Sequence, residues 1–237
     1  MKNKKKTIIT TMTIICLVGS IVTLILMLNW NNDVKENNQI QQNLEKYLET
    51  ANEDKINIDF EELKKINKDT VGYIEVPNTN VRYVVVKGED NSYYLNHNFN
   101  KEKNVAGWIF MDYKNKADGT DKNLVIYGHE TKDGSMFGSL SNLLSEDFIK
   151  KKENLIITFV TERGIKKYKI FSIYTIEPED YYISVDFDDN EFNRFKEKIK
   201  KRSLFQLESD LENKNIITLS TCQNHGAKRL AVHAVEI

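Results

Sequence analysis

The sequence predicts a mainly β fold with added helices, in which eight strands close into a small barrel. Two observations support this prediction. From position 71 onward, short runs rich in β-branched and aromatic residues alternate with turn residues. Closure of these strands into a barrel also removes the unpaired edges that an open sheet would expose. The expected strands are Val71–Glu75, Val81–Val86, Ala106–Met111, Leu124–Tyr127, Leu155–Val160, Lys167–Ile176, Ile216–Ser220 and Arg229–Val235.

Helices are expected before the strands and between them. Residues 31–57 are polar, and Leu44, Tyr47 and Leu48 recur at helical spacing, which predicts a linker that leads into an amphipathic helix. A long insert, residues 177–215, interrupts the strands before the last two. The other expected helices are Ile58–Ile66, Met136–Leu144, Glu146–Lys152 and, inside the insert, Asn190–Arg202.

The amino terminus has the features of a membrane anchor. Lys2 and Lys4–Lys6 precede an uncharged run from Thr7 to Trp30. Within this run, Ile8–Leu28 is long enough to cross a hydrocarbon core of ~30 Å as a helix. The lysines are expected to stay in the cytoplasm, which places the rest of the chain outside the cell membrane. A cleaved signal peptide is the alternative, but its apolar region is usually shorter and ends at a small-x-small site, which we do not find here.

The chain therefore divides into three parts. Residues 1–30 form the cytoplasmic lysines and the transmembrane signal-anchor, residues 31–57 the linker and amphipathic helix, and residues 58–237 one domain of catalytic size. The composition, 40% hydrophobic and 29% charged, is ordinary for a globular protein. The net charge of -1 argues against a general nucleic-acid-binding protein, because no excess of positive charge is available to displace counterions from phosphates.

The two cysteines lie in different parts of the chain. Cys16 belongs to the membrane segment and Cys222 lies near the carboxyl end, so they cannot pair within one folded chain. An unpaired cysteine in an exported protein is a candidate reactive thiol. A buried apolar cysteine is the alternative interpretation.

Two apolar segments each deliver a reactive side chain at the end of a predicted strand. Leu124-Val-Ile-Tyr-Gly-His129 ends in a histidine, and Ile216-Ile-Thr-Leu-Ser-Thr-Cys222 ends in a cysteine. Strand ends are rigid platforms that face open loops, which suits groups that need fixed geometry and access to substrate. Arg229 opens the next strand after a short loop, so antiparallel pairing is expected to bring it near Cys222.

These three side chains fit an acyl-transfer reaction. A thiol becomes a good nucleophile when an imidazole accepts its proton, and the same imidazole can later protonate a leaving amine. The carbonyl oxygen gains negative charge during the reaction and needs a donor or a cation beside it. We therefore expect Cys222 to be the nucleophile, His129 its acid/base partner and Arg229 the cation on the oxyanion side.

Several motifs resemble those of the sortase family. Thr218-Leu-Ser-Thr-Cys222 followed by Arg229 is similar to the sortase signature of a Leu-x-Thr-Cys strand with a downstream arginine, and Tyr127-Gly-His129 matches the sortase histidine motif. Lys132-Asp-Gly-Ser-Met-Phe-Gly-Ser-Leu140, the helices expected before position 71 and the helix in the long insert resemble class B sortases in particular. The resemblance covers almost the whole exported region, and it implies an eight-stranded barrel with a groove for a sorting peptide.

The resemblance also implies an activity. Class B sortases are membrane-anchored cysteine transpeptidases of Gram-positive bacteria. By this resemblance, Cys222 attacks the Thr-x bond of a pentapeptide signal, of the Asn-Pro-x-Thr-x kind, near the carboxyl terminus of a secreted protein. An amine of the cell wall, in peptidoglycan or in its lipid-linked precursor, then resolves the acyl-enzyme. Neither a metal ion nor an organic cofactor is required.

Further site residues are implied by the same resemblance. Some class B members carry an acidic residue soon after the cysteine, where this chain has Gln223 and Asn224, so we assign no catalytic aspartate. The residues implied to bind the sorting peptide are Asn91 and Leu95, from an Asn-x-x-x-Leu pattern, Tyr182 and Ile183 in the long insert, and Ser220 two residues before the cysteine.

The remaining histidines provide alternatives. His225 lies beside Cys222 in the sequence and competes with His129 for the role of base. His233 is expected to be structural, and His97 to lie at the surface or in a turn. A metal site made from His97, His225 and Cys222 is conceivable, but the paired ligand spacing typical of such sites is not present.

Other functions were weighed against the sortase interpretation. Papain-like peptidases place the cysteine before the histidine, whereas His129 precedes Cys222 here. L,D-transpeptidases carry a Ser-His-Gly-x-Cys-x-Arg pattern, and the residues before Cys222 are Leu-Ser-Thr instead. A non-catalytic, anchored binding module is the alternative from another class, and its function would tolerate replacement of the cysteine.

Overall fold

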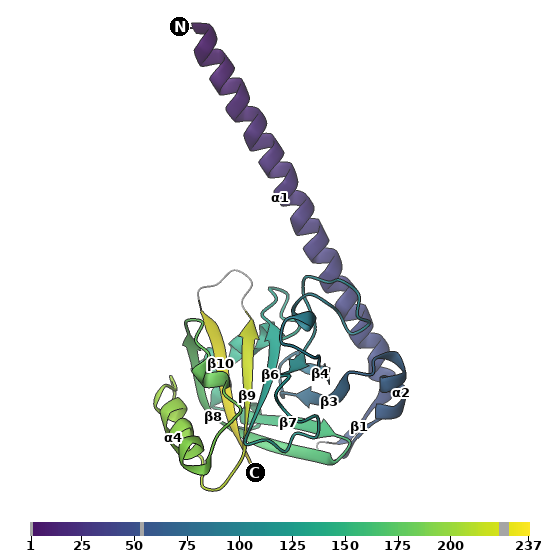
Figure 1. The fold of residues 1–237 in the computed structure, drawn as a ribbon, viewed down its shortest axis with the longest axis vertical. Helices are drawn as coiled ribbons and strands as arrows, with labels where there is room; N and C mark the ends of the chain where they lie inside the picture. Colours follow the sequence, from purple (N-terminus) through teal and green to yellow (C-terminus); the bar gives the residue numbers. More distant parts are fainter. Residues whose placement is uncertain (1, 53–54, 223–227) are drawn as a thin grey trace.

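The computed structural model describes residues 2–52, 55–222 and 228–237, with the backbone alone at positions 2, 3, 5, 49–52, 55 and 222. A long helix extends from one side of a body of strands and short helices (Figure 1). The elements, in which η marks a 3-10 helix, are α1 (Lys2–Leu44), η1 (Glu45–Tyr47), β1 (Leu48–Asn52), β2 (Lys55–Ile58), α2 (Phe60–Ile66), β3 (Thr70–Glu75), β4 (Arg82–Val86), η2 (Tyr93–Leu95), β5 (Phe110–Met111), β6 (Asn123–His129), η3 (Gly138–Leu144), α3 (Glu146–Ile149), η4 (Lys152–Leu155), β7 (Ile156–Thr161), β8 (Gly164–Ile176), η5 (Tyr181–Ile183), α4 (Asp189–Lys201), β9 (Ile216–Cys222) and β10 (Arg229–Glu236).

Eight of the described strands close into a barrel, which confirms the predicted fold class. Their order is β10-β8-β7-β3-β4-β5-β6-β9, and β9 pairs with β10 to complete the ring. The pairs β6–β9 and β4–β5 are parallel. Because β6 and β9 are parallel neighbours, their carboxyl ends lie at the same end of the barrel. β6 ends at His129 and β9 ends at Cys222, so both candidate residues lie at this end.

The strands bury side chains on both of their faces. Leu219 of β9 and Val232 of β10 belong to the large hydrophobic cluster that includes the barrel interior. Ile216 of β9 and Ala231 of β10 belong to a second cluster on the outer face, which also contains residues of α4. Because successive side chains of a strand point to opposite faces, these residues identify the face that each position of β9 and β10 occupies.

The polar segment 31–57 differs from its prediction. α1 continues without interruption to Leu44, so a helix rather than a linker joins the apolar segment to the barrel. Val34, Ile40 and Leu44 are buried on one side of this helix. The segment then turns into the β1–β2 hairpin, which the sequence did not predict. Packing against the barrel, which a local sequence pattern does not reveal, stabilises this polar stretch as helix.

The strand predicted for Ala106–Met111 is much shorter in the structure, because β5 contains only its last two residues. Gly107 adopts a φ of 59°, in the left-handed region, and this conformation interrupts the extended backbone. A Cβ atom at this glycine would lie only 2.4 Å from the carbonyl oxygen of Tyr94. The residues before β5 therefore form a tight turn that packs closely against the loop after β4.

The long insert contains the predicted helix, α4. A capping box begins it, in which the Asp188 side chain accepts a hydrogen bond from the Glu191 N–H and the Glu191 side chain accepts one from the Asp188 N–H. Phe192, Phe195 and Ile199 join the outer hydrophobic cluster. These contacts attach the insert to the outer face of β8, β9 and β10.

A buried polar network lies between this outer face and the insert. His233 Nδ1 lies 2.8 Å from the Thr218 hydroxyl, and His233 Nε2 lies 2.9 Å from the Tyr174 hydroxyl. Since the Thr218 hydroxyl donates its only proton to Asn123, it accepts the Nδ1 proton of His233, and Tyr174 then donates to Nε2. Burial lowers the pKa of His233 to about 3, so the imidazole is neutral at physiological pH. The expectation that His233 is structural agrees with this burial.

His233 should make the stability of the fold depend on pH. Its ordinary pKa is 6.5, so the unfolded chain binds a proton below that pH while the folded chain binds none until about pH 3. The free energy of unfolding should therefore fall as the pH drops from 6.5 towards 3, by about 2 kcal/mol at pH 5. Urea unfolding of the full chain in detergent at pH 7 and pH 5 measures this loss. His233→Gln should remove most of it, and an unchanged pH dependence in that variant would contradict the assignment.

Candidate active site

The parallel pairing of β6 with β9 brings two candidate residues together. His129 and Cys222 are Cα partners in adjacent strands, at the carboxyl ends of both. Adjacent strands lie about 4.8 Å apart, so the two positions are neighbours across the sheet. The backbone of Cys222 is described, and its thiol lies outside the described part of the structure.

Arg229 lies on the other side of the cysteine-bearing strand. β10 runs antiparallel to β9, and their Cα pairing ends with Ala231 opposite Ser220. The next N–H, of Leu230, donates to the Thr221 hydroxyl at 2.9 Å. Continuing the register by two residues brings Arg229 level with Cys222. Alternation places positions 220, 222, 229 and 231 on the outer face, the face of the second hydrophobic cluster. The three candidate positions therefore follow one another across β6, β9 and β10 on one face of the barrel.

His129 is held by a main-chain acceptor. The side chain is buried, and its Nε2 lies 2.6 Å from the carbonyl oxygen of Leu95. A carbonyl oxygen can only accept, so Nε2 must carry a proton. In a neutral imidazole Nδ1 is then the nitrogen that can accept a proton, and in the imidazolium form it is the nitrogen that can give one up.

The contacts around the His129 ring leave little room for movement. A Cβ atom at Gly107 would lie 2.8 Å from the Leu95 carbonyl oxygen and 3.0 Å from Cδ2 of His129. The neighbouring N–H of Trp108 donates to the Tyr94 carbonyl oxygen at 2.9 Å. The turn before β5 and the 3-10 helix η2 thus form the seat of the imidazole, by which we mean Leu95 and Gly107.

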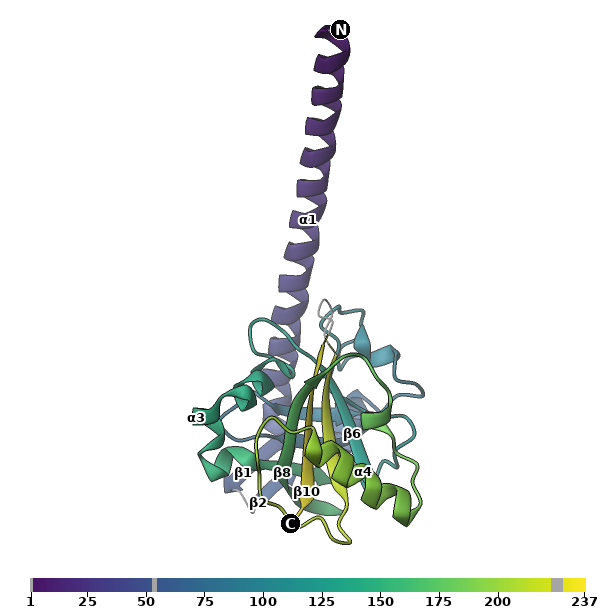
Figure 2. The ribbon, with the colours of Figure 1, turned by 90° about the vertical axis from the view of Figure 1, so that its left-hand side faces the viewer.

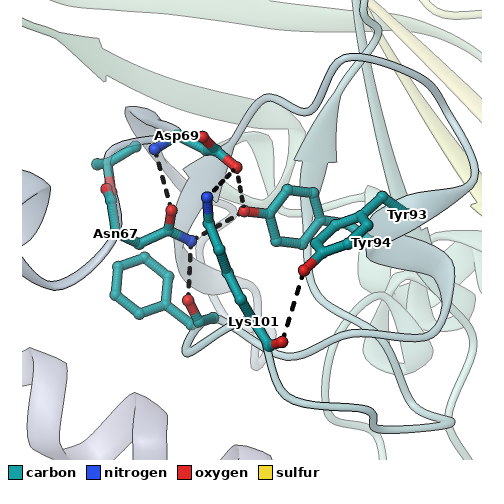
Figure 3. Close-up of polar contacts among 7 residues, drawn as sticks. Asn67, Asp69, Tyr93, Tyr94 and Lys101 are labelled. Atoms are coloured by element: carbon teal, nitrogen blue, oxygen red, sulfur yellow. Dashed lines mark hydrogen bonds and ion pairs between the residues drawn. The ribbon is translucent and has the colours of Figure 1, made fainter.

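A polar cluster at the start of the barrel fixes η2 (Figure 3). The Tyr94 hydroxyl donates to Asp69 at 2.6 Å and accepts from the Asn67 amide at 2.9 Å. Lys101 forms an ion pair of 2.9 Å with Asp69. Burial, and then the neighbouring Asp69 carboxylate, raises the pKa of the Tyr94 hydroxyl well above its ordinary range, so it remains a donor. The residue before Leu95 is therefore anchored by charge-assisted hydrogen bonds.

Two of the implied peptide-binding residues lie near this seat. Leu95 is partly exposed and supplies the carbonyl that binds His129. The Asn91 side chain donates to the buried Asp112 at 2.8 Å and accepts from the Tyr113 N–H at 3.0 Å. Its amide thus braces the loop before η2, and a contact with a substrate remains a prediction.

The other three lie on the side of the insert. The hydroxyl groups of Tyr182 and Ser220 are 2.8 Å apart, and both side chains are fully buried. Ile183 is partly exposed next to them. The bond between Tyr182 and Ser220 joins η5 to β9 two residues before the candidate nucleophile, so these two side chains position the insert in the structure. Whether they also contact a peptide remains a prediction.

The remaining histidines do not share this setting in the described part of the chain. His97 is partly exposed, and its ring stacks on Tyr93 with centroids 4.0 Å apart. His233 is buried in the network below α4. His225 lies outside the described residues, and so does the metal site weighed for His97, His225 and Cys222 as a whole.

The sequence did not reveal the groups that hold His129. The Leu95 carbonyl belongs to the main chain, so no side-chain pattern could reveal it. Gly107 did give a signal, since an isolated glycine in a predicted strand often marks a bulge or a close approach of two backbones. Asn67 and Asp69 precede the first strand of the barrel, and their spacing does not connect them with His129, which lies 62 and 60 residues later.

The polar cluster should contribute measurably to stability. Tyr94→Phe removes a buried hydroxyl with two partners, and we expect it to lower the free energy of unfolding by about 1–3 kcal/mol. The matched control is Tyr93→Phe, whose exposed hydroxyl makes a single 3.5 Å contact and should cost less than about 0.5 kcal/mol. Urea unfolding of the full chain in detergent compares the two variants, and equal losses would contradict a special role for Tyr94.

Comparison with known proteins identifies relatives of the whole barrel. A family model of the sortase domain matches residues 74–237. Sortase B of Listeria monocytogenes is 39% identical over 168 residues, which is 69% of this chain and 67% of the relative. Sortase B of Staphylococcus aureus is 34% identical over 192 residues, which is 79% of this chain and 78% of the relative.

Solved structures also resemble the fold of this chain. Sortase B from B. anthracis in complex with AAEK1 has a TM-score of 0.77 and 33% sequence identity, with 86% of this chain and 98% of that chain covered. A Staphylococcus aureus sortase B–substrate complex has a TM-score of 0.71 and 36% identity, with 75% and 84% covered. With its matched domain, its relatives and its closed barrel in agreement, the chain belongs to the sortase family, as a cysteine transpeptidase of class B.

Proposed function

We propose that Cys222, His129 and Arg229 carry out a sortase B reaction that cleaves a Thr-x bond in a sorting signal. The acyl group passes to an amine of the cell wall, in peptidoglycan or its lipid-linked precursor. The observation that supports this most is the register of β6, β9 and β10. His129 and Cys222 are Cα partners, and the β9–β10 register, continued two residues past Ala231 and Ser220, brings Arg229 level with Cys222.

In the first half-reaction the Cys222 thiolate attacks the threonine carbonyl carbon. The C=O π electrons move to the oxygen, and Arg229 donates hydrogen bonds to the oxyanion. When the carbonyl re-forms, the C–N bond breaks and the leaving amine takes a proton from Nδ1 of the His129 imidazolium. The products are a thioester on Cys222, the released peptide and a neutral imidazole.

In the second half-reaction the cell-wall amine attacks the thioester carbon. Nδ1 of His129 accepts the proton that the amine loses, and the C–S bond breaks to release the Cys222 thiolate. The hydrogen bond from Nε2 to the Leu95 carbonyl supports both steps, because it fixes the tautomer of the neutral ring and stabilises the charged one. The enzyme returns to its starting state with one amide bond exchanged for another.

The positions of the implied substrate residues support a binding site for the sorting peptide between η2 and η5. Leu95 and Ile183 are partly exposed, and offer apolar surface on either side of the strand ends. Asn91 braces the loop before η2, and the bond between Tyr182 and Ser220 braces η5. We propose that all five residues shape the site of the sorting peptide. Leu95 and Ile183 contact the peptide, and the other three residues contact it or support the residues that do.

We also propose that α1 anchors the protein in the cell membrane, with its amino terminus in the cytoplasm and the barrel outside. One described helix, near the amino terminus, is long and apolar enough to cross a bilayer. The large apolar side chains from Ile8 to Leu28 are exposed along this helix, which suits lipid rather than water. The lysines at its start favour the cytoplasmic side.

The proposed nucleophile has a direct chemical test. The full chain in detergent is incubated with a library of sorting peptides, and mass spectrometry is used to locate the acyl group. We expect a thioester on Cys222, which Cys222→Ala abolishes together with cleavage. Cys16→Ala is the matched control and should retain both. Continued peptide cleavage by Cys222→Ala would show that the nucleophile is another residue.

The proposed base can be tested against its competitor. His129→Ala should lower kcat for peptide cleavage by about 10²–10⁴-fold, since proton transfer to the leaving amine is then lost. His225→Ala should have a mild effect. Steady-state kinetics of both variants in the full chain compares their kcat values. An equal loss of kcat in the two variants would show that His129 is not the specific base proposed here.

A further inference from the structure

The end of α1 that follows the apolar segment is docked on the turn before β5. The Asn37 side-chain amide donates to the Gly107 carbonyl oxygen at 2.8 Å and to the Asn104 side chain at 3.1 Å. One turn earlier, the Asp33 carboxylate accepts from the Val105 N–H at 2.8 Å. Figures 1 and 2 show that the amino-terminal part of α1 extends away from the barrel, whereas its carboxyl-terminal part lies beside the barrel.

Asn37 is an unusual residue for this position. Its side chain is fully buried, and its Oδ1 has no hydrogen-bond partner within the described residues. A buried amide whose acceptor is unsatisfied costs about 1–3 kcal/mol, whereas an apolar side chain of similar size would avoid this cost. Only the NH₂ group of the Asn37 amide forms hydrogen bonds in the described structure, and these bonds hold the turn before β5.

The turn that Asn37 holds is also one wall of the histidine seat. Gly107 packs against the Leu95 carbonyl oxygen and the His129 ring, closely enough that a Cβ would lie within 3.0 Å of both. Asn37 binds the carbonyl of that same glycine. A shift of this turn would therefore move the Leu95 carbonyl or the ring, and lengthen the 2.6 Å bond that fixes the tautomer.

We propose that Asn37 is a positioning residue for the sortase reaction, through which the docked end of the anchor helix keeps His129 in its productive tautomer and orientation. The inference rests on the proposed function, in which His129 is the acid and base. The anchor helix is then a structural part of the active site, in addition to its role at the membrane. Loss of this contact should disturb the imidazole and leave the pairing of β6, β9 and β10 unchanged.

The test compares Asn37→Ala with Asn32→Ala in the full chain in detergent. Asn32 is exposed on the same helix, so the two substitutions remove the same amide and raise helix propensity equally. Asn37→Ala should lower kcat for the sorting peptide on the order of tenfold and leave KM little changed, because the defect lies in alignment of the imidazole. Asn32→Ala should match the wild-type chain.

A second measurement reports on the imidazole without any turnover. In chains labelled with ¹⁵N-histidine, the neutral ring of wild-type His129 should show Nε2 protonated and Nδ1 unprotonated. Asn37→Ala should mix the two tautomers, and Asn32→Ala should not. Thermal unfolding shows whether each variant is folded. If Asn37→Ala is not folded, Asp33→Ala removes the neighbouring contact to the same turn, at the Val105 N–H, and should change the ring in the same direction.

The outcomes separate the inference from the proposed function. Equal kcat and equal histidine spectra in folded Asn37→Ala, Asn32→Ala and wild-type chains would overturn the role of Asn37. Absence of a thioester in the wild-type chain would instead overturn the proposed function, and the tautomer of His129 could still be measured. A tautomer change in Asn37→Ala with unaltered kcat would also overturn the inference, because the ring would then tolerate misalignment.

Discussion

The parallel pairing of β6 with β9 is the constraint on which the rest of the site depends. His129 and Cys222, which face each other across these strands, are 93 residues apart in the sequence, and only closure of the barrel brings them side by side. A parallel pair needs a long crossover connection, and this one includes β7, β8 and the whole insert. The backbone positions of His129 and Cys222 therefore meet only in the complete fold.

Around these strand ends, the helices and turns act as supports. The insert is attached to the outer face through the Phe192 cluster and to β9 through the bond between Tyr182 and Ser220. On the opposite side, η2 is clamped by Asp69 and Tyr94, and its last carbonyl binds His129. The chain thus orients the imidazole with a main-chain oxygen, whose helix is held by the partly exposed Asp69, where other enzymes use a carboxylate for this purpose.

Local patterns in the sequence predicted the barrel, most strand positions and α4, because alternation and helical spacing depend on nearby residues. They also identified the strand ends at His129 and Cys222, whose catalytic roles stay proposals. The continuous helix after position 30 was missed, because Val34, Ile40 and Asn37 are stabilised by distant parts of the chain. The seat of His129 was missed for the same reason, since it consists of backbone atoms and a glycine turn.

The uninterrupted α1 has a mechanical consequence if it anchors the barrel as we propose. The carboxyl ends of β6 and β9 and the free end of α1 lie at the same side of the molecule in both views (Figures 1 and 2). A continuous helix, unlike a flexible linker, fixes both the distance of the barrel from the bilayer and its orientation about the helix axis. Each residue added between the bilayer and Asp33 would lift the barrel by about 1.5 Å and rotate it by about 100°. The length of this short stretch therefore decides what the catalytic end can reach.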